Sequence, residues 1–216
     1  MKLKKGDFIE IEYTGKVKET NEIFDLTSEK EAKKNNLFNP KAPYGPLTVC
    51  LGQGDLIKGL EDQLVGKEPG NYTIEIPSDK AFGKKDPKLM KIVNTNIFKK
   101  QKISPFPGLR LNMDGFIGTI RSVSGGRTII DFNHPLAGRN LIYEIKINRV
   151  VTNPEDKLQG FLKLRLGKSV KTELKNGEAK VDLELPDKAK KEIESVIKKA
   201  IKEVKKVTFS KTTTKE

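Results

Sequence analysis

Four short segments in which apolar and polar residues alternate constrain the fold of this chain more than any other feature. They lie at 8–13, 47–51, 72–76 and 143–147. In the first segment Ile9, Ile11 and Tyr13 fall on one face, and a period of two is typical of a half-buried β-strand. We therefore predict strands in all four segments, and we expect the last to return to the sheet that the first begins.

A short amphipathic helix is predicted between two glycine turns. Its apolar residues, at helical spacing, are Leu56, Ile57, Leu60 and Leu64. Gly52 and Gly54 break the strand before it, and Gly66 ends it because glycine readily adopts the left-handed conformation after a helix. The polar stretch 27–36 predicts a second short helix.

Residues 84–132 contain enough apolar residues for a small core of their own. We therefore predict that they form a separate module. Two apolar runs flank Gly125 and Gly126, which is the pattern of a β-hairpin. The region is rich in Ile, Phe, Met and Leu. Two uses of these side chains remain open: they fill the small core of the module, or they stay exposed and bind other chains.

The chain beyond Asn153-Pro154 predicts a third region, which begins with a helix around 158–166. Apolar residues between 193 and 204 recur at helical spacing and predict a second helix, with Asp187 as its N-cap. Strands are expected on both sides of Asn176-Gly177 and at 207–211.

Positive charge is concentrated in the last two regions. The chain has 42 Lys and Arg residues against 29 Asp and Glu, a net charge of +13. Residues 84–132 carry +7 and residues 154–216 carry +6, whereas the remainder is neutral. This distribution favours partners with negative surfaces, such as ribosomal RNA or acidic unfolded chains, although solubility alone would also account for it.

The residue inventory excludes several classes of chemistry. A single cysteine, Cys50, rules out an internal disulfide, and a single histidine, His134, argues against a zinc or nickel site built from histidines. Cys50 and His134 are better interpreted as a core cysteine and a loop histidine than as nucleophile and base. The pair Glu61-Asp62 is expected on a solvated helix face.

No apolar run approaches the ~18 residues that span a bilayer, and no apolar secretory segment is seen, so we expect a cytoplasmic protein.

Five strings along the chain resemble the FKBP-type peptidyl-prolyl cis/trans isomerases. They are IEYTG (11–15), IFD (23–25), GQGDLIKGLEDQLVGKEPGNY (52–72), IPSDKAFG (76–83) and NHPLAGRNLIYEI (133–145). The block between AFG and NHPLAG resembles the insert-in-flap domain of the SlyD-like branch. With its C-terminal extension, the chain resembles the long archaeal type of this family.

The resemblance implies an α+β fold with three parts. The first is an FKBP-type antiparallel sheet wrapped on a short helix, expected over 1–83 and 133–153. The second is a small β-rich insert-in-flap domain, expected over 84–132. The third is a small, basic α+β C-terminal domain, expected over 154–216.

The resemblance also implies roles for residues within the matching strings. The implied catalytic residues are Tyr13, Asp25, Phe82 and Tyr143. The implied substrate-binding residues are Phe24, Leu47, Leu56, Ile57, Leu60 and Ala81. The backbone amide of Ile57 would receive substrate carbonyls. Leu60 replaces a common tryptophan, which predicts a wider pocket floor, and Phe82 lacks the hydroxyl of the usual tyrosine.

The role of Asp25 remains open among three alternatives. It orients Tyr13, it meets the twisted amide of the substrate, or it only satisfies a buried hydroxyl, since buried polar groups are usually paired.

The implied activity is peptidyl-prolyl cis/trans isomerisation (rotamase activity) that accelerates proline-limited folding, with chaperone-like binding of unfolded chains by the insert. It requires no cofactor and no metal, and the tail lacks the histidines and cysteines of a nickel-binding SlyD tail. Expected partners are proline-containing peptides and unfolded proteins, with the ribosome as a candidate. We expect no binding to a membrane and no binding to specific DNA sequences. The alternative is a non-enzymatic, basic ribosome- or RNA-associated chaperone on an FKBP scaffold. The role of the C-terminal region is open between ribosome attachment and dimerisation.

Overall fold

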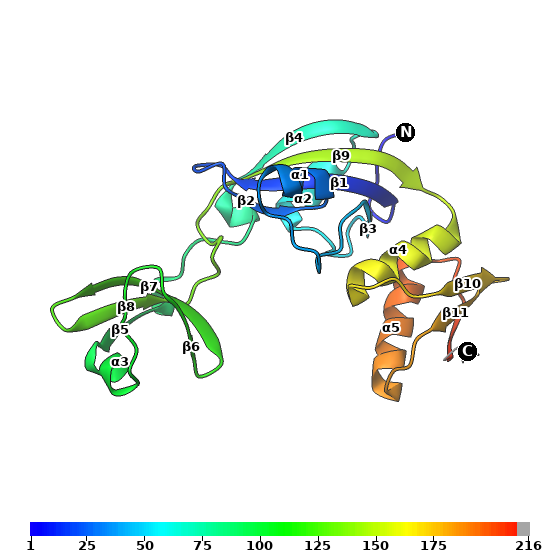
Figure 1. The fold of residues 1–216 in the computed structure, drawn as a ribbon. Helices are drawn as coiled ribbons and strands as arrows, with labels where there is room; N and C mark the ends of the chain where they lie inside the picture. The colour runs from blue at the N-terminus through cyan, green and yellow to red at the C-terminus, as the bar shows by residue number, and fades with distance from the viewer. Residues whose placement is uncertain (211–216) are drawn as a thin grey trace. The chain divides into compact units, whose positions relative to one another are not determined.

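Strand β1 (Phe8–Val17) is central to a five-stranded sheet in the structure, a computed structural model that describes residues 1–210 (Figure 1). The chain divides into two compact units. The first is made of Met1–Ile76 and the chain from Leu141 onward, and the second is Pro77–Asn140. Each unit is described by itself below.

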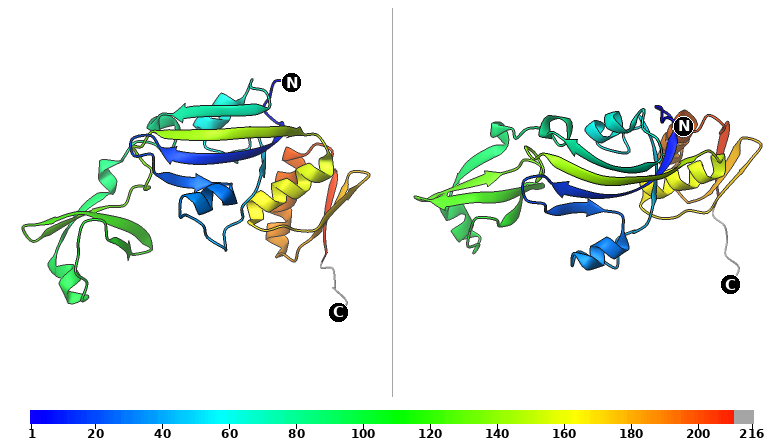
Figure 2. Two further views of the ribbon diagram at one scale, coloured as in Figure 1. Left: turned by 45° about the horizontal axis from the view of Figure 1, so that its top comes forward. Right: turned by 90° about the horizontal axis from the view of Figure 1, so that it is seen from above.

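The sheet of the first unit is built on a long antiparallel pair. β1 pairs with β9 (Leu141–Val151) along its whole length, from Phe8 opposite Val151 to Val17 opposite Leu141. β4 (Gly70–Ile76) lies on the other side of β9, as both views of Figure 2 show. β2 (Ile23–Leu26) and β3 (Leu47–Cys50) pair with β1. All four alternating segments are therefore strands of one sheet, and 143–147 returns to it as predicted.

Two short helices accompany this sheet. α1 (Glu29–Lys34) begins after Ser28, whose side chain accepts a hydrogen bond from the Glu31 backbone N. α2 (Lys58–Leu64) follows a chain reversal in which Gly52 and Gly54 have φ of 87° and 74°, a region that glycine adopts at little cost. α2 starts later than its apolar pattern suggested, because the two apolar residues before it are extended loop.

The expectation for the acidic pair on α2 is only half right. Asp62 is exposed, whereas Glu61 is half-buried and its Oε1 atom is buried without a hydrogen-bond partner among the described residues. Glu61 lies one turn before the buried Leu64, so it sits at the margin of the face that α2 packs inward.

The C-terminal part of the first unit has mixed helices and strands. Its elements are α4 (Pro154–Leu166), β10 (Thr172–Lys175), β11 (Glu178–Asp182), α5 (Asp187–Ala200) and β12 (Lys206–Ser210). β11 pairs antiparallel with β10 and parallel with β12. The turn at Asn176-Gly177 has positive φ at both residues, and β10 and β11 are the strands predicted on its two sides.

Two details of the predicted C-terminal helix and strand differ. Asp187 is the first residue of α5, and Pro186 takes the N-cap position without a side-chain hydrogen bond, so the predicted Asp187 cap is wrong. The fixed φ of proline suits the turn into a helix better than the sequence pattern alone indicated. The helix ends at Ala200, although Ile201 and Val204 remain buried. β12 covers most of the predicted last strand, and Lys211 lies outside the described residues.

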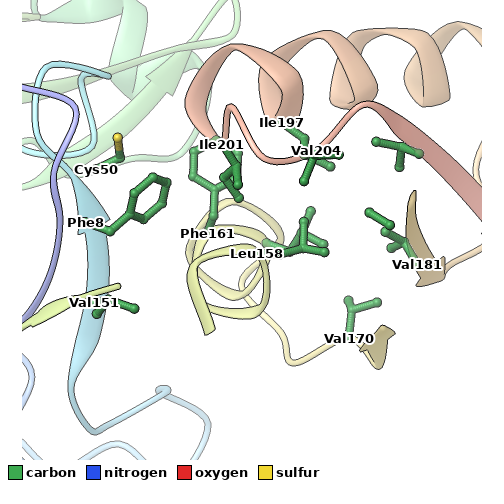
Figure 3. Close-up of a cluster of buried hydrophobic side chains, with 13 residues drawn as sticks. Phe8, Cys50, Val151, Leu158, Phe161, Val170, Val181, Ile197, Ile201 and Val204 are labelled. Carbon is green, nitrogen blue, oxygen red and sulfur yellow. The ribbon is translucent and has the colours of Figure 1, made fainter. Parts of the chain in front are cut away.

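One hydrophobic core joins the sheet to this C-terminal part. Phe8 and Cys50 of the sheet belong to this core, in which the Phe8 ring points toward Phe161 of α4 (Figure 3). The rings of Phe8 and Phe161 meet edge to face with centroids 6.1 Å apart. α4 approaches β3 so closely that any Cβ on Gly160 would overlap Thr48. Cys50 is thus a buried core cysteine, as interpreted from the sequence.

The second unit is a four-stranded sheet with a short helix. Its elements are η1 (Ser78–Lys80), η2 (Pro87–Leu89), β5 (Met90–Asn94), α3 (Asn96–Lys100), β6 (Arg110–Met113), β7 (Phe116–Ser124) and β8 (Arg127–Asp131). The strand order is β5-β8-β7-β6, all antiparallel. β7 and β8 form the predicted hairpin around Gly125-Gly126. The small core consists of Phe98, Ile120 and Ile130.

The expected fold class, a mixed α+β chain with antiparallel sheets, is confirmed. The second unit extends beyond the predicted insert 84–132 on both sides, and the division into three functional domains stays a prediction. Among residues 1–210, no helix is both long enough and apolar enough to cross a bilayer.

Candidate functional site

Tyr13 and Asp25 form the polar pair of the candidate site. Tyr13 lies on β1 and Asp25 on the neighbouring β2, where Asp25 is paired with Gly15 in the antiparallel register. The Tyr13 hydroxyl donates a hydrogen bond of 2.7 Å to Asp25 Oδ2. Asp25 is exposed, and its role among the three alternatives stays a prediction.

Three aromatic rings stand together next to this pair. The Tyr143 ring on β9 lies 5.6 Å from the Tyr13 ring and 5.7 Å from the Phe24 ring, measured between centroids. A Cβ on Gly15 would lie 2.7 Å from Phe24 Cζ, so the glycine in this strand makes room for the Phe24 ring. The structure therefore brings together four of the residues that the sequence assigned to the site.

Burial keeps the two tyrosine hydroxyls protonated. Desolvation, with the Asp25 carboxylate as a further cause, raises the pKa of both Tyr13 and Tyr143 well above its usual value. At neutral pH Tyr13 is therefore a hydrogen-bond donor and not a base. Neither tyrosine can therefore act as a general base at neutral pH.

A pocket of about 250 Å³ opens beside the Tyr13–Asp25 pair. Leu47, another predicted site residue, lines it together with that pair. The rest of its lining comes from 26–27, from the loop 42–44, and from Lys163, Leu164 and Gly167 at the end of α4. Its volume is just below the roughly 300–1,000 Å³ of pockets for larger ligands, so it suits one residue-sized group.

Leu56, Ile57 and Leu60 occupy the loop and first turn of α2. Leu60 is buried in the core, while Leu56 and Ile57 are half-buried. Ile57 is the N-cap of α2, and its backbone N–H has no hydrogen-bond partner among residues 1–210. A free amide at this position is what the predicted contact with a substrate carbonyl requires.

Ala81 and Phe82 belong to the second unit. Ala81 follows the short helix η1, and the Phe82 ring stacks on His134 with centroids 4.4 Å apart and planes 2° from parallel. His134 lies in a loop, as interpreted from the sequence. The assignment of Ala81 and Phe82 to the substrate site stays a prediction.

Sequence reasoning missed the residues that α4 contributes. Lys163, Leu164 and Gly167 lie more than 130 residues after Asp25, beyond the expected domain boundary at 153/154. Tyr44 was also missed, although an aromatic residue between Pro43 and Pro46 was a visible signal. No local pattern could have linked α4 to the pocket, because only the docking of α4 on β3 brings them together.

Nucleophilic and metal chemistry find little support in the described residues. Burial, followed by the charge of Asp55, raises the pKa of Cys50 to about 12, which keeps the thiol protonated and unreactive at neutral pH. Among residues 1–210, no group of three or more His, Cys, Asp and Glu side chains could hold a metal ion.

Two family models match this chain. The model of the FKBP-type peptidyl-prolyl cis-trans isomerases matches residues 1–99, and the model named FKBP26, IF domain, matches residues 91–136. The first covers β1 to β4 with the Tyr13–Asp25 pair. The second covers most of the second unit.

Curated relatives lead to the same family. The short-type peptidyl-prolyl cis-trans isomerase of Methanocaldococcus jannaschii is 32% identical over 149 residues, which cover 68% of this chain and 94% of that protein. SlyD of Treponema pallidum is 29% identical over 167 residues, covering 75% and 86%. The FKBP-type 16 kDa isomerase of Escherichia coli is 33% identical over 107 residues, covering 47% and 72%. The chain thus belongs to the FKBP-type peptidyl-prolyl cis-trans isomerases.

Proposed function

We propose that this isomerase holds the prolyl residue of its substrate beside Tyr13 and Asp25. The observation that carries the proposal is the 2.7 Å hydrogen bond from the Tyr13 hydroxyl to the exposed Asp25 carboxylate, two residues that line the same residue-sized pocket. The rings of Phe24 and Tyr143 supply an apolar surface next to the pair. Leu56, Ile57 and Leu60 would contribute the loop and the floor.

The physical basis is stabilisation of a twisted peptide bond. Rotation breaks amide resonance and meets a barrier of ~18–20 kcal/mol, so uncatalysed X-Pro isomerisation takes roughly tens to hundreds of seconds. The twisted amide has less charge separation than the planar one. A water-poor aromatic surface therefore favours the twisted state over the ground state, which is catalysis by differential binding.

Named groups would hold the substrate during this rotation. The free N–H of Ile57 would donate to the carbonyl of the peptide, and Tyr13, kept protonated by burial, would keep Asp25 in place. Asp25 would then face the amide whose charge changes on twisting. Phe82, without a hydroxyl, would offer only its ring, and no proton is transferred in any step.

The second unit would bind unfolded client chains. Phe116 is 70% exposed and Ile117 is 58% exposed, and Ile92 and Phe106 are also largely exposed. Large apolar side chains left exposed in this way are candidate contacts for unfolded chains. Phe98, Ile120 and Ile130 of the same unit form its buried core instead. Some apolar residues of the insert therefore fill its core, and others would be free to bind clients.

The finer expectations on partners follow from charge. A net charge of +6 over 154–216 and +7 over 84–132 would favour acidic surfaces, which include unfolded acidic chains and, as a candidate, ribosomal RNA. We propose a cytoplasmic site of action. The relatives above are all named as isomerases, so the comparisons give no support to the non-enzymatic alternative.

The catalytic part of the proposal is tested by removing both polar groups. The full chain with Tyr13→Phe and Asp25→Ala should lose at least ~tenfold in kcat/KM on an Ala-Pro tetrapeptide, or ~1.4 kcal/mol of transition-state stabilisation. Tyr72→Phe is the matched control, because it removes a hydroxyl that bonds the Glu68 carbonyl outside the pocket. Undiminished activity of the double variant would place the site elsewhere.

The chaperone part is tested by deleting 84–132 and closing the gap with a short loop. Activity on the tetrapeptide should persist, whereas catalysis of a proline-limited protein refolding reaction should fall sharply. Equal losses on both substrates would contradict client binding by the insert.

A further inference from the structure

The carboxylate of Asp55 is an unusual feature of the loop between β3 and α2. Its side chain is only 3% exposed. Oδ2 accepts a hydrogen bond of 2.9 Å from the Cys50 backbone N at the end of β3. Oδ1 accepts one of 2.7 Å from Arg165 Nη2, which comes from the last turn of α4. Both oxygens of a buried charge are thus used, one within the loop and one by a residue 110 positions away.

Arg165 is itself held in place. Its guanidinium lies over the Phe161 ring, 4.5 Å from the centroid. Phe161 is buried against Phe8, and the close approach of Gly160 to Thr48 fixes α4 on β3. The planar guanidinium therefore reaches Asp55 from a rigid support.

The position of Asp55 gives this ion pair a consequence for the site. Asp55 directly precedes Leu56 and Ile57, and Ile57 carries the free N–H proposed to bind the substrate carbonyl. The glycines at 52 and 54 leave the preceding loop little intrinsic stiffness. The two hydrogen bonds of Asp55 tie the chain just before the binding residues to the end of β3 and to α4.

We propose that Arg165 is a positioning residue for catalysis: through Asp55 it holds the loop that presents Leu56 and Ile57 to the substrate. This inference rests on the proposed function, because it takes the Ile57 amide as a substrate contact. In this proposal α4, which lies outside the predicted isomerase domain, contributes to substrate binding through Arg165. The same end of α4 also supplies Lys163 and Leu164 to the pocket beside Tyr13 and Asp25.

The physical reason is the state of Asp55 when Arg165 is lost. A buried carboxylate oxygen without its charged partner is costly, so the loop would move to bring Asp55 toward water. Displacement of a binding group by about 1 Å is enough to lower catalysis by up to ~100-fold. Substrate binding should suffer first, since the amide contacts the substrate in the ground state as well.

The test is Arg165→Ala in the full chain, with kcat and KM determined on an Ala-Pro tetrapeptide. We expect KM to rise roughly tenfold with little change in kcat, the signature of lost uniform binding. Arg165→Lys keeps the charge and should recover part of the loss. Lys168→Ala, an exposed residue just after α4, is the control and should behave as wild type. Hydrogen exchange of the Cys50 amide, which donates to Asp55 Oδ2, should speed up in Arg165→Ala alone.

A purely structural role gives a different result. It would lower apparent kcat in proportion to the unfolded fraction and leave KM unchanged, and this result would overturn the inference. In the double variant Arg165→Ala/Asp55→Asn, the loss should not exceed that of Asp55→Asn, because both act through one interaction; additive losses would also overturn it. An inactive wild type would instead contradict the proposed function, while unchanged amide exchange in Arg165→Ala would count against the positioning role by itself.

Discussion

The first unit and the second unit use their apolar residues in opposite ways. In the first, a cluster of thirteen buried residues joins the sheet, α4, α5 and the last two strands. In the second, three residues form the buried core, while large side chains such as Phe116, Ile117 and Ile92 stay exposed. In the first unit, the apolar side chains of this cluster pack together and hold the helices and strands in fixed positions. In the second unit, several large apolar side chains remain in contact with solvent.

This difference fits the two tasks proposed for the two units. A pocket that discriminates between amide geometries needs rings and hydrogen bonds held within tight limits, which a large shared core provides. A surface that binds unfolded chains needs apolar side chains in water, and a small unit that exposes them is left with marginal stability. The comparison predicts that matched substitutions change the stability of the two units by different amounts.

The largest effect is expected from a matched pair of Phe→Ala substitutions. Each removes a buried ring, at a cost of ~3–5 kcal/mol. Phe161→Ala should destabilise the first unit and leave it folded, because twelve other residues maintain its core. Phe98→Ala should unfold the second unit, because Phe98 is the largest of the three fully buried side chains of its small core. Residue-resolved hydrogen exchange would show this, and equal protection losses in both units would break the comparison.

A smaller effect is expected from the buried charge at the end of β8. Asp131 has a fully buried side chain whose oxygens accept hydrogen bonds from Lys85, Asn133 and Arg121. Burial alone would raise its pKa, but these bonds outweigh burial and hold the pKa well below its usual value. Asp131→Asn should therefore cost the second unit ~3 kcal/mol at neutral pH, as expected for breaking a buried pair.

The pH dependence of this effect has a defined sign. The folded pKa of Asp131 lies below the unfolded value of ~3.9. Its contribution is complete above that value and is lost as the pH falls through the folded pKa. The stability gap between wild type and Asp131→Asn should thus narrow below about pH 4, as followed by the unfolding of the second unit.

The first unit offers the control for this charge effect. Glu10 pairs with Arg149 at 3.1 Å, and both side chains remain in contact with solvent. Glu10→Gln should change stability by no more than ~1 kcal/mol, because exposed pairs contribute little. A loss as large as that of Asp131→Asn would contradict the view that burial sets the difference.

The smallest effect on stability is expected on the exposed surface of the second unit. Phe116→Ser should change stability within ~0.5 kcal/mol, since the side chain is 70% exposed. Binding of a permanently unfolded protein should nevertheless weaken several-fold, while tetrapeptide activity stays at the wild-type level. Isothermal titration with such a protein provides the measurement, and unchanged affinity would mean that clients bind elsewhere.

Much of the local structure was predictable because it depends on neighbours in sequence. The alternation of Ile9 and Ile11, the reversal at Gly52 and Gly54, and the hairpin at Asn176-Gly177 each follow from short-range periodicity or backbone preference. The N-cap at Asp187 failed because a cap depends on where the first helical turn closes, and sequence pattern places helix ends only to within a few residues.

The candidate site divides along the same line. The resemblance gave Tyr13 and Asp25 their roles, which stay predictions, and the structure places the two residues on neighbouring strands with a hydrogen bond between them. The rings of Phe24 and Tyr143 lie 5.7 Å apart between centroids, and their roles likewise stay predictions. The partial burial of Glu61 was not visible, since it depends on how deeply α2 packs.

The amino-acid sequence by itself determined the strands, the turns, the two basic regions and the family, because each is written in residues close together along the chain. Only the tertiary structure decided that α4 lies against β3, that Arg165 meets Asp55, and that Lys163 borders the pocket. These contacts join residues more than a hundred positions apart. They arise from the way two apolar faces fit, and no local pattern of a sequence specifies which faces will meet.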